Sequence, residues 1–235
     1  MKTAIMQPYL FPYIGYWQLI HAVDQFVLLD DVNYIRRGFI NRNSILLEGK
    51  PYRFTIPVRQ ASQNRLIRDM ELDFDREKKD KFLKTIHSAY RKAPCYEAVY
   101  SLIEEIIHNE EYDLTGFIEY SIRKIMAYLH MDTEVMLSSG IPKKEGLRGE
   151  ERILEICRRL GTDTYINPCG GRELYSQAHF REAGICLYFL DTQKEQVIYR
   201  QGQDEFTENL SILDILMFND VEAVLKLLER YELNE

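Results

Sequence analysis

The start of the chain has two short apolar runs with a predicted helix between them. Residues 3–6 form a short apolar run, which predicts a buried strand, and a helix is expected at residues 15–23. Another short apolar run, at residues 26–29, predicts a second strand. A strand, a helix and a strand in this order predict a βαβ unit, whose crossover is right-handed in nearly all proteins.

The middle of the chain has the periodicity of helices. Apolar residues recur every three or four positions in three successive segments, at residues 75–92, 96–108 and 114–129. Asp113 is placed to cap the third helix, because a carboxylate accepts hydrogen bonds from the free backbone N–H groups of a first turn. Residues 75–131 are therefore predicted to form a helical subdomain or insertion.

Short strands dominate the segments on either side of this block. Two strand-like runs around Glu48-Gly49-Lys50 predict a β-hairpin. After the helical block, strands and helices alternate, at residues 134–137, 150–160, 164–166, 175–183, 185–190 and 221–231. Alternation of this kind favours a parallel sheet covered by helices. Residues 1–74 and 132–235 are thus predicted to form an α/β domain with a mostly parallel sheet and flanking helices.

Composition and charge narrow the class of protein. The chain has 235 residues, of which 46% are hydrophobic, and this is enough for a sizeable core. Its formal net charge of −7 argues against a general nucleic-acid binder, which needs a basic surface to neutralise phosphates. No apolar run approaches the roughly 20 residues that span a membrane, and Pro8 and Pro12 interrupt the apolar start. These features favour a soluble, cytoplasmic protein.

Cysteine and histidine form no recognisable catalytic or metal-binding pattern. The cysteines have no C-x-x-C pair and no histidine at zinc-ligand spacing, and are expected to be reduced thiols. None of the five histidines has a serine, cysteine or acid at an informative spacing. The sequence therefore predicts no metal site and identifies no cofactor.

Polar and glycine-containing segments follow several of the predicted strands. The carboxyl ends of parallel strands meet at one edge of a sheet, so these segments are expected to form one small-molecule site. A small molecule that carries a phosphate or a carboxylate is the expected ligand. The expected substrate-binding residues are Gln7, Tyr9, Tyr13, Gly15, Asn41, Arg42, Asn43, Ser138, Ser139, Lys144, Arg148, Asn167, Gly170, Gly171 and Tyr175.

Asp30 and Asp31 are the candidate catalytic residues. They follow the second predicted strand, where carboxylates can act as a general base or as metal ligands. Successive strand side chains face opposite ways, so only one of the two is expected to point into the crevice. Arg42, between two asparagines, can grip a phosphate or carboxylate.

Each of these segments also has a purely structural interpretation. The loop at residues 7–15 can bind an anion at a helix N-terminus, or it can be a packed aromatic seal on the sheet edge. The basic loop with Lys144 and Arg148 can steady donor phosphates or can be a solvated charge run. Gly170 and Gly171 can admit a ligand or can form a tight turn.

Several segments together match one family. They read I-M-Q-P-Y-L-F-P-Y-I-G-Y at residues 5–16, L-L-D-D-V-N-Y-I at 28–35, I-N-R-N-S-I at 40–45 and T-Y-I-N-P-C-G-G-R-E-L-Y at 164–175. On these segments the chain resembles the WbqC-like family of bacterial O-antigen and related polysaccharide loci. The resemblance covers nearly the whole chain and extends to Tyr199, Gln201, Ser211 and Asp214. Phe39-Ile40 departs from the family pattern, in which a tryptophan-like aromatic and a polar residue are expected, and this bears on substrate fit.

The resemblance implies a transferase that moves an aminoacyl or acyl group in the decoration of a nucleotide-activated sugar. The implied partners are a small-molecule substrate, either a nucleotide-sugar or an activated donor, and a glycosyltransferase or another protein of the same pathway. Two alternatives stay open. Tyr13-Ile14-Gly15-Tyr16 has the I-G core of the H-I-G-H nucleotidyltransferases, although tyrosine cannot supply the proton chemistry of histidine. A non-catalytic binding or assembly protein is the other alternative, because no nucleophile or metal motif is present.

Overall fold

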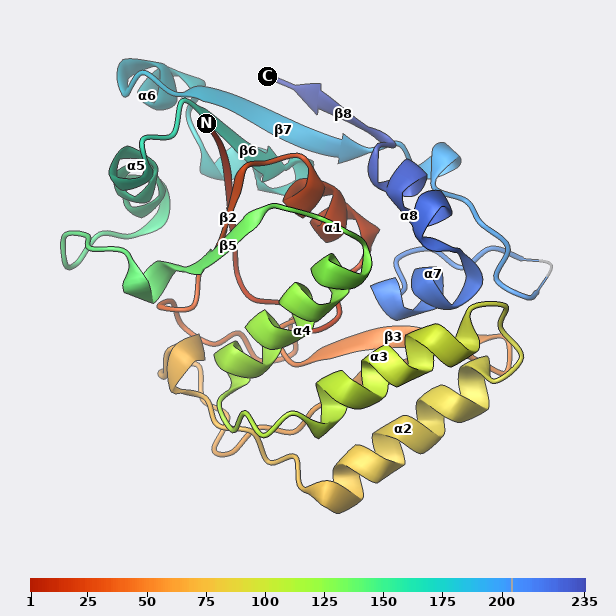
Figure 1. Ribbon diagram of the computed structural model, residues 1–235. Helices are drawn as coiled ribbons and strands as arrows, with labels where there is room; N and C mark the ends of the chain where they lie inside the picture. The colour runs from red at the N-terminus through yellow and green to blue at the C-terminus, as the bar shows by residue number, and fades with distance from the viewer. Residues whose placement is uncertain (204) are drawn as a thin grey trace.

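Residues 1–203 and 205–235 are described by the computed structural model, whose main layer is a six-stranded sheet (Figure 1). The strands lie in the order β5 (Glu134–Leu137), β2 (Gln25–Leu28), β1 (Lys2–Met6), β6 (Thr164–Pro168), β7 (Cys186–Thr192) and β8 (Tyr231–Asn234). The first five are parallel, and β8 pairs with β7 in the antiparallel direction. The predicted α/β class with a mostly parallel sheet is confirmed.

The strand order reverses between β1 and β6. Counted along the chain, the five parallel strands lie in the order third, second, first, fourth and fifth. The chain therefore builds one side of the sheet from β1 outwards and then returns to build the other side. In open α/β sheets, ligands bind outside the carboxyl ends of the strands at such a reversal, which is called the topological switch point.

Helices cover both faces of the sheet because alternate strand residues point to opposite faces. Ala4 packs in an apolar cluster with helix α1 (Ile14–His21), whereas Ile5 packs in a second cluster on the other face. That second cluster includes apolar residues of α5 (Gly149–Leu160) and α6 (Gln177–Glu182). Gly161 ends α5 in the left-handed conformation, with φ at 68°.

The segment between β2 and β5 forms a hairpin and three long helices. Strands β3 (Arg42–Leu47) and β4 (Lys50–Thr55) pair in the antiparallel direction, as predicted. In Figure 1, α3 (Tyr96–His108) and α2 (Arg76–Tyr90) lie below β3, whereas α4 (Leu114–Tyr128) lies to its left and extends above it. A 3-10 turn, η1 (Ile67–Asp69), lies between the hairpin and these helices in the sequence.

The three helices share their apolar contacts with the sheet. Phe82, Ile103 and Ile118 belong to the same buried cluster as Phe26 of β2. Asp113 caps α4 as predicted, since its Oδ1 accepts a hydrogen bond from the Gly116 N–H at 2.7 Å. The division into a helical subdomain at residues 75–131 and an α/β domain stays a prediction.

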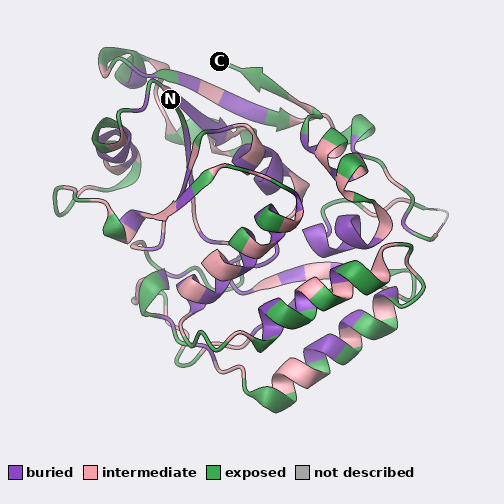
Figure 2. Ribbon diagram, viewed as in Figure 1, coloured by how far each residue is buried: buried purple, intermediate pink, exposed green. Residues whose placement is uncertain are grey.

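The C-terminal region differs from the expectation in three ways. Helix α7 (Ile212–Phe218), in which every residue but Phe218 is buried, was not predicted, because such a short segment has no amphipathic period (Figure 2). The expected helix at residues 221–231 ends earlier, as α8 (Val221–Leu228), and β8 follows it. Helix α8 packs against α1, where Gln18 Nε2 donates to the Leu227 carbonyl at 3.0 Å. Among the described residues, no helix has the length and apolar character needed to cross a membrane.

Candidate functional site

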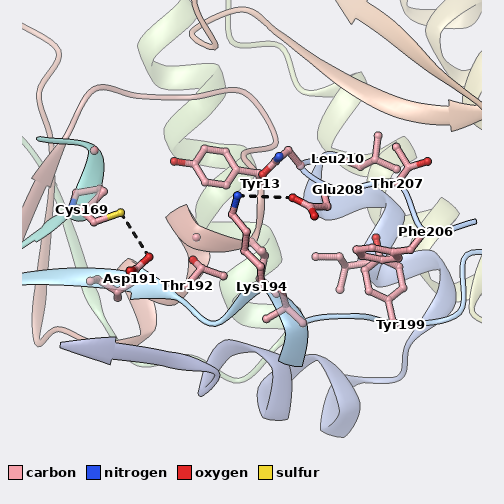
Figure 3. Close-up of a pocket in the computed structure, with 18 residues that line it drawn as sticks. Tyr13, Cys169, Asp191, Thr192, Lys194, Tyr199, Phe206, Thr207, Glu208 and Leu210 are labelled. Atoms are coloured by element: carbon pink, nitrogen blue, oxygen red, sulfur yellow. Dashed lines mark hydrogen bonds and ion pairs between the residues drawn. The ribbon is translucent and has the colours of Figure 1, made fainter. Parts of the chain in front are cut away.

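A cavity of about 300 Å³ lies at the topological switch point (Figure 3). Its walls come from the start of α1, from the ends of β6 and β7, and from the segment that follows β7. Lining residues include Tyr13, Gly15, Cys169, Gly170, Asp191, Thr192, Lys194, Tyr199, Phe206, Thr207 and Glu208. We call it the switch-point cavity.

The start of α1 forms one wall of the switch-point cavity. The N-cap residue, Tyr13, has no side-chain hydrogen bond to the helix, which leaves first-turn N–H groups available to an anion. Burial, and to a lesser extent nearby Cys169, raises the pKa of Tyr13, so its hydroxyl stays protonated and can donate. A Cβ at Gly15 would lie 2.9 Å from the Tyr13 ring and 3.1 Å from Thr192 Oγ1. Glycine at this position therefore lets α1 approach β7 closely.

The ends of β6 and β7 bring a thiol and a carboxylate together. Cys169 Sγ lies 3.5 Å from Asp191 Oδ1 (Figure 3). Burial, reinforced by the charge of Asp191, raises the pKa of Cys169 above its ordinary value. At neutral pH the thiol is therefore a poor nucleophile. Beside it, a Cβ at Gly170 would meet no atom within 4 Å, so the backbone there is open to a ligand.

The segment after β7 closes the cavity on a third side. Figure 3 shows Lys194 and Glu208 pairing across the cavity, with 3.7 Å between their charged groups. The rings of Tyr199 and Phe206 pack edge to face at 5.3 Å. The cavity thus combines aromatic surface with a charge pair that a ligand can displace.

A buried polar network holds this closing segment in place. Asp214 is fully buried, and its carboxylate accepts hydrogen bonds from the hydroxyls of Tyr90 and Tyr199, both at 2.7 Å. Gln201 Nε2 donates to the same carboxylate at 3.2 Å, and Gln201 Oε1 accepts from the Thr207 N–H at 2.7 Å. Burial raises the pKa of Asp214 although these hydrogen bonds oppose the shift. The network connects the helical segment, through Tyr90, to the wall of the cavity.

Asp30 and Asp31 lie on the other side of β1 and have different partners. Asp31 lies 2.8 Å from Lys143 Nζ and 3.6 Å from Arg152, and accepts from the Ser138 hydroxyl at 2.7 Å. Burial alone would raise the pKa of Asp31, but these hydrogen bonds and charges outweigh it and lower the pKa. A lowered pKa makes Asp31 a weak base.

Asp30 lines a second cavity, of about 400 Å³, which we call the acidic cavity. It lies at the ends of β2 and β5, where residues of η1 and the start of α4 complete its walls. Its charged residues are Asp30, Arg68, Asp69, Glu71 and Asp113. Among the described residues, no group of three or more histidine, cysteine or acidic side chains is arranged to hold a metal ion.

A third cavity, of about 600 Å³, carries Arg36, Arg37 and Arg42, and we call it the arginine cavity. None of these arginines forms an ion pair with a residue that the structure describes. Arg42 Nε donates to the Gly38 carbonyl at 2.9 Å. The ring centroid of Phe39, in the same loop, lies 6.2 Å from the ring centroid of Tyr13. This aromatic contact links the loop to the switch-point cavity.

The comparisons with known proteins agree with the sequence resemblance. The model of the WbqC-like protein family matches residues 7–226. The chain belongs to the WbqC-like family. The uncharacterized protein Rv1507c of Mycobacterium tuberculosis is 25% identical over 224 residues, which cover 94% of this chain and 95% of that protein. No solved structure matches this chain at a significant level.

Residues that carry the WbqC-like pattern are divided among the three cavities and do not line a single one. Tyr13, Gly15 and Gly170 line the switch-point cavity, Asp30 and Ser139 line the acidic cavity, and Asn41 and Arg42 line the arginine cavity. The structure therefore divides these residues among three cavities, and their binding roles stay predictions. The strand ends do lie along one edge, but each cavity is bounded by a different insertion or loop.

The other expected binding residues line none of these three cavities, and several have structural partners instead. Asn43 Nδ2 donates to the Phe11 carbonyl at 2.7 Å and so ties β3 to the loop after β1. Asn167 Nδ2 would lie 2.2 Å from a Cβ at Gly171, so that glycine makes room for a buried asparagine. The residues outside the three cavities are Gln7, Tyr9, Asn43, Ser138, Lys144, Arg148, Asn167, Gly171 and Tyr175.

Sequence reasoning also missed several residues of the site. Lys143, rather than its exposed neighbour Lys144, reaches Asp31, because only the former points back towards the end of β2. Asp191 and Thr192 end β7 in the switch-point cavity. The strand-end rule that singled out the other segments applies equally to β7, so this signal was present in the sequence. The sequence around Phe206 has no pattern that predicts a binding residue, and Phe206 lines the cavity from the long loop after β7.

Proposed function

We propose that this protein is a cytoplasmic transferase that acts on a nucleotide-activated sugar bound in the switch-point cavity. The observation that carries the proposal is the position of this cavity at the reversal of strand order, between β1 and β6. Sheets of this order bind nucleotides and related anions at that position, because helix N-termini and strand ends converge there.

The lining of the cavity suits the parts of such a ligand. The open backbone at Gly170 and the first turn of α1 favour a phosphate, and Lys194 can leave Glu208 to pair with it. The rings of Tyr199 and Phe206 offer apolar faces to a base or a sugar. Asp191 supplies the carboxylate that can accept hydrogen bonds from sugar hydroxyls or take a proton from the acceptor.

Membership in the WbqC-like family supports the choice of reaction. We infer that the transferred group is an aminoacyl or acyl group and that the product enters O-antigen or related surface-polysaccharide synthesis. A glycosyltransferase of the same machinery is the expected protein partner. In this proposal the arginine cavity, through Arg42, takes a second anionic group of the donor or substrate.

The nucleotidyltransferase alternative has one observation in its favour and one against it. The Tyr13-Ile14-Gly15-Tyr16 segment begins the helix after β1, at the switch point, where a phosphate would bind. Tyr16, however, is fully buried, and its hydroxyl donates to the Gln7 carbonyl at 3.0 Å. It is therefore unavailable to a phosphate, and the transferase is the preferred proposal.

A pair of glycine variants tests the site. Gly170 and Gly140 both follow a parallel strand, and at each a Cβ would meet no atom within 4 Å, but only Gly170 lines the switch-point cavity. The melting temperature is followed while nucleotides, nucleotide-sugars and acyl donors are titrated into the wild type, Gly170→Val and Gly140→Val. A ligand of the folded state raises the melting temperature by mass action.

The expected result is that a nucleotide-sugar stabilises the wild type and Gly140→Val alike. Gly170→Val should bind the same ligand about tenfold more weakly or worse, because the valine occupies space next to the ligand. Mass spectrometry of the stabilising pair of substrates should then detect the acylated sugar. Equal binding by both variants would remove the site from the proposal. Pyrophosphate release would favour the nucleotidyltransferase, and binding without any turnover would favour an assembly protein.

A further inference from the structure

The acidic cavity holds two buried polar atoms that lack hydrogen-bond partners within the described chain. Asp30 is 1% exposed and its Oδ2 is unpartnered, and Thr115 is 2% exposed and its Oγ1 is unpartnered. Among the residues that the structure describes, one other buried side-chain atom lacks a hydrogen-bond partner, Gln25 Oε1, and Gln25 does not line this cavity. A buried polar atom left unpaired costs free energy, so two such atoms in one cavity indicate that a bound molecule completes them.

Both atoms are held in position by the surrounding structure. The other oxygen of Asp30, Oδ1, accepts a hydrogen bond from the Ser139 N–H at 2.8 Å, and the Asp30 carbonyl accepts from the Arg68 N–H at 3.0 Å. Thr115 lies in the first turn of α4, which Asp113 caps. The backbone around the two unpartnered atoms is therefore fixed by β2 and α4, and each atom has less than 1 Å² of exposed surface, so side chains of the cavity wall must shift when a ligand binds.

The charge of the cavity selects a cation. Four carboxylates line it against a single guanidinium, that of Arg68, which lies 3.9 Å from Asp69 at an exposed position. A metal ion is disfavoured, because no group of three or more ligands is arranged to hold one within the described residues. A primary ammonium group has three N–H donors and no acceptor, so it can satisfy Asp30 Oδ2 and Thr115 Oγ1 together.

We propose that the acidic cavity binds the primary ammonium group of a small molecule, with Asp30 and Thr115 as its direct partners. An amino sugar and an amino-acid derivative share this chemistry. The site uses none of the residues of the switch-point cavity, and β1 separates the two. This inference therefore does not rest on the nucleotide-sugar proposal, and either can fail alone.

The backbone amide of Ser139 offers a direct reporter, since it donates to the same carboxylate that would hold the ammonium group. Two-dimensional ¹H–¹⁵N NMR follows this amide while glucosamine, glycinamide or N-acetylglucosamine is added at low ionic strength. The first two carry an ammonium group and the third is its uncharged counterpart. We expect the Ser139 signal to move with an ammonium probe and to stay in place with N-acetylglucosamine.

Matched variants separate binding from folding. Asp30→Asn keeps an acceptor for Ser139 and removes the charge, and it should weaken ammonium binding about tenfold or more, as expected for a lost charged hydrogen bond. Thr115→Val keeps the shape of the side chain and should weaken binding by a smaller factor. Asp132→Asn removes an exposed carboxylate outside the cavity and should leave binding unchanged. If Asp30→Asn does not fold, the Thr115 variant still tests the site.

The source of the ligand follows from the two ammonium probes. A response to glucosamine alone supports an amino sugar, and a response to both supports recognition of the ammonium group in either class. No response to either probe, an equal response to N-acetylglucosamine, or unchanged binding by both Asp30→Asn and Thr115→Val would overturn the proposal. A preference for Mg²⁺ over both amines at the Ser139 amide would also overturn it.

Discussion

The switch-point cavity and the acidic cavity lie at the same edge of one sheet, yet different helices, strands and loops form their walls. The first is formed by α1, β6, β7 and the segment after β7, and it offers open backbone, aromatic rings and a displaceable ion pair. The second needs the segment inserted between β2 and β5, because Asp69 comes from η1 and Thr115 from α4. Neighbouring strands lie about 4.8 Å apart, so β2 and β6 are separated by about 10 Å.

This difference shows how an α/β sheet gains a second cavity. Strand order alone creates the switch-point cavity, as in other open sheets. The acidic cavity arises because an insertion covers strand ends that would otherwise face solvent. The two cavities should therefore respond separately to substitution, and the variants below are chosen to separate them.

The largest effect is expected from Asp214→Ala, which removes the acceptor shared by Tyr90, Tyr199 and Gln201. Loss of this buried network should lower the free energy of unfolding by about 3 kcal/mol, because the hydroxyls of Tyr90 and Tyr199 lose their acceptor, whereas Gln201 Nε2 keeps the Thr207 carbonyl. Urea denaturation measures this change. Nucleotide-sugar binding should fall with it, whereas the response of the Ser139 amide to glucosamine should remain.

Tyr199→Phe is the matched control, since it deletes a single hydroxyl of the same network. It should cost about 1 kcal/mol, the usual value of one hydrogen bond. A loss of less than about 1 kcal/mol in Asp214→Ala would show that the network does not hold the wall of the cavity.

A smaller, pH-dependent effect is expected from Asp31→Asn. The folded-state pKa of Asp31 is lowered, so the ionised group stabilises the fold above its unfolded-state pKa, near 3.9, and this stability is lost as the pH falls through the folded value. At pH 7 the variant should be less stable by about 2 kcal/mol. Urea denaturation from pH 7 down to pH 3 should show the difference constant above pH 5 and shrinking below pH 4. A difference that grows on acidification would contradict the ion pair with Lys143.

The smallest effects are expected at the exposed basic loop. Lys144→Ala and Arg148→Ala should each change the free energy of unfolding by less than about 0.5 kcal/mol, as is usual for exposed positions. They should also leave nucleotide-sugar binding unchanged, because neither residue lines the switch-point cavity. Lys143→Met should destabilise the protein more than either, through Asp31. Weaker nucleotide-sugar binding in Lys144→Ala would restore the role that the sequence suggested for this loop.

The sequence predicted the elements of the fold better than it predicted the site. Strand β5 and helix α3 have the predicted bounds, because each has a clear period and a marked end. Strand β8 was missed because it is a short edge strand that β7 alone specifies. The order of strands cannot be read from local periodicity, and that order decides which strand ends share a cavity.

The same limit explains why some predicted binding residues lie outside the three cavities. Asn43 and Asn167 are polar residues at strand ends, as binding residues are, but both satisfy buried backbone groups. The sequence cannot distinguish these two uses of an amide, because the distinction depends on how the chain folds around each side chain: Asn43 bonds to Phe11, 32 residues away, and Asn167 to its neighbour Pro168. Cys169 and Asp191 are 22 residues apart in the sequence and meet only because β6 and β7 are neighbours.

Protection of Cys169 from alkylation shows whether a nucleotide-activated sugar binds in the switch-point cavity. Cys169 and Cys186 are both exposed free thiols, but only Cys169 lines this cavity, so Cys186 is an internal control in the unaltered chain. Mildly alkaline conditions suit the reaction, because the pKa of Cys169 is raised. With the nucleotide-sugar at ten times its Kd, mass spectrometry should show alkylation of Cys169 slowed about tenfold and that of Cys186 unchanged. A bound nucleotide-sugar that leaves the rate at Cys169 unaltered would contradict the account.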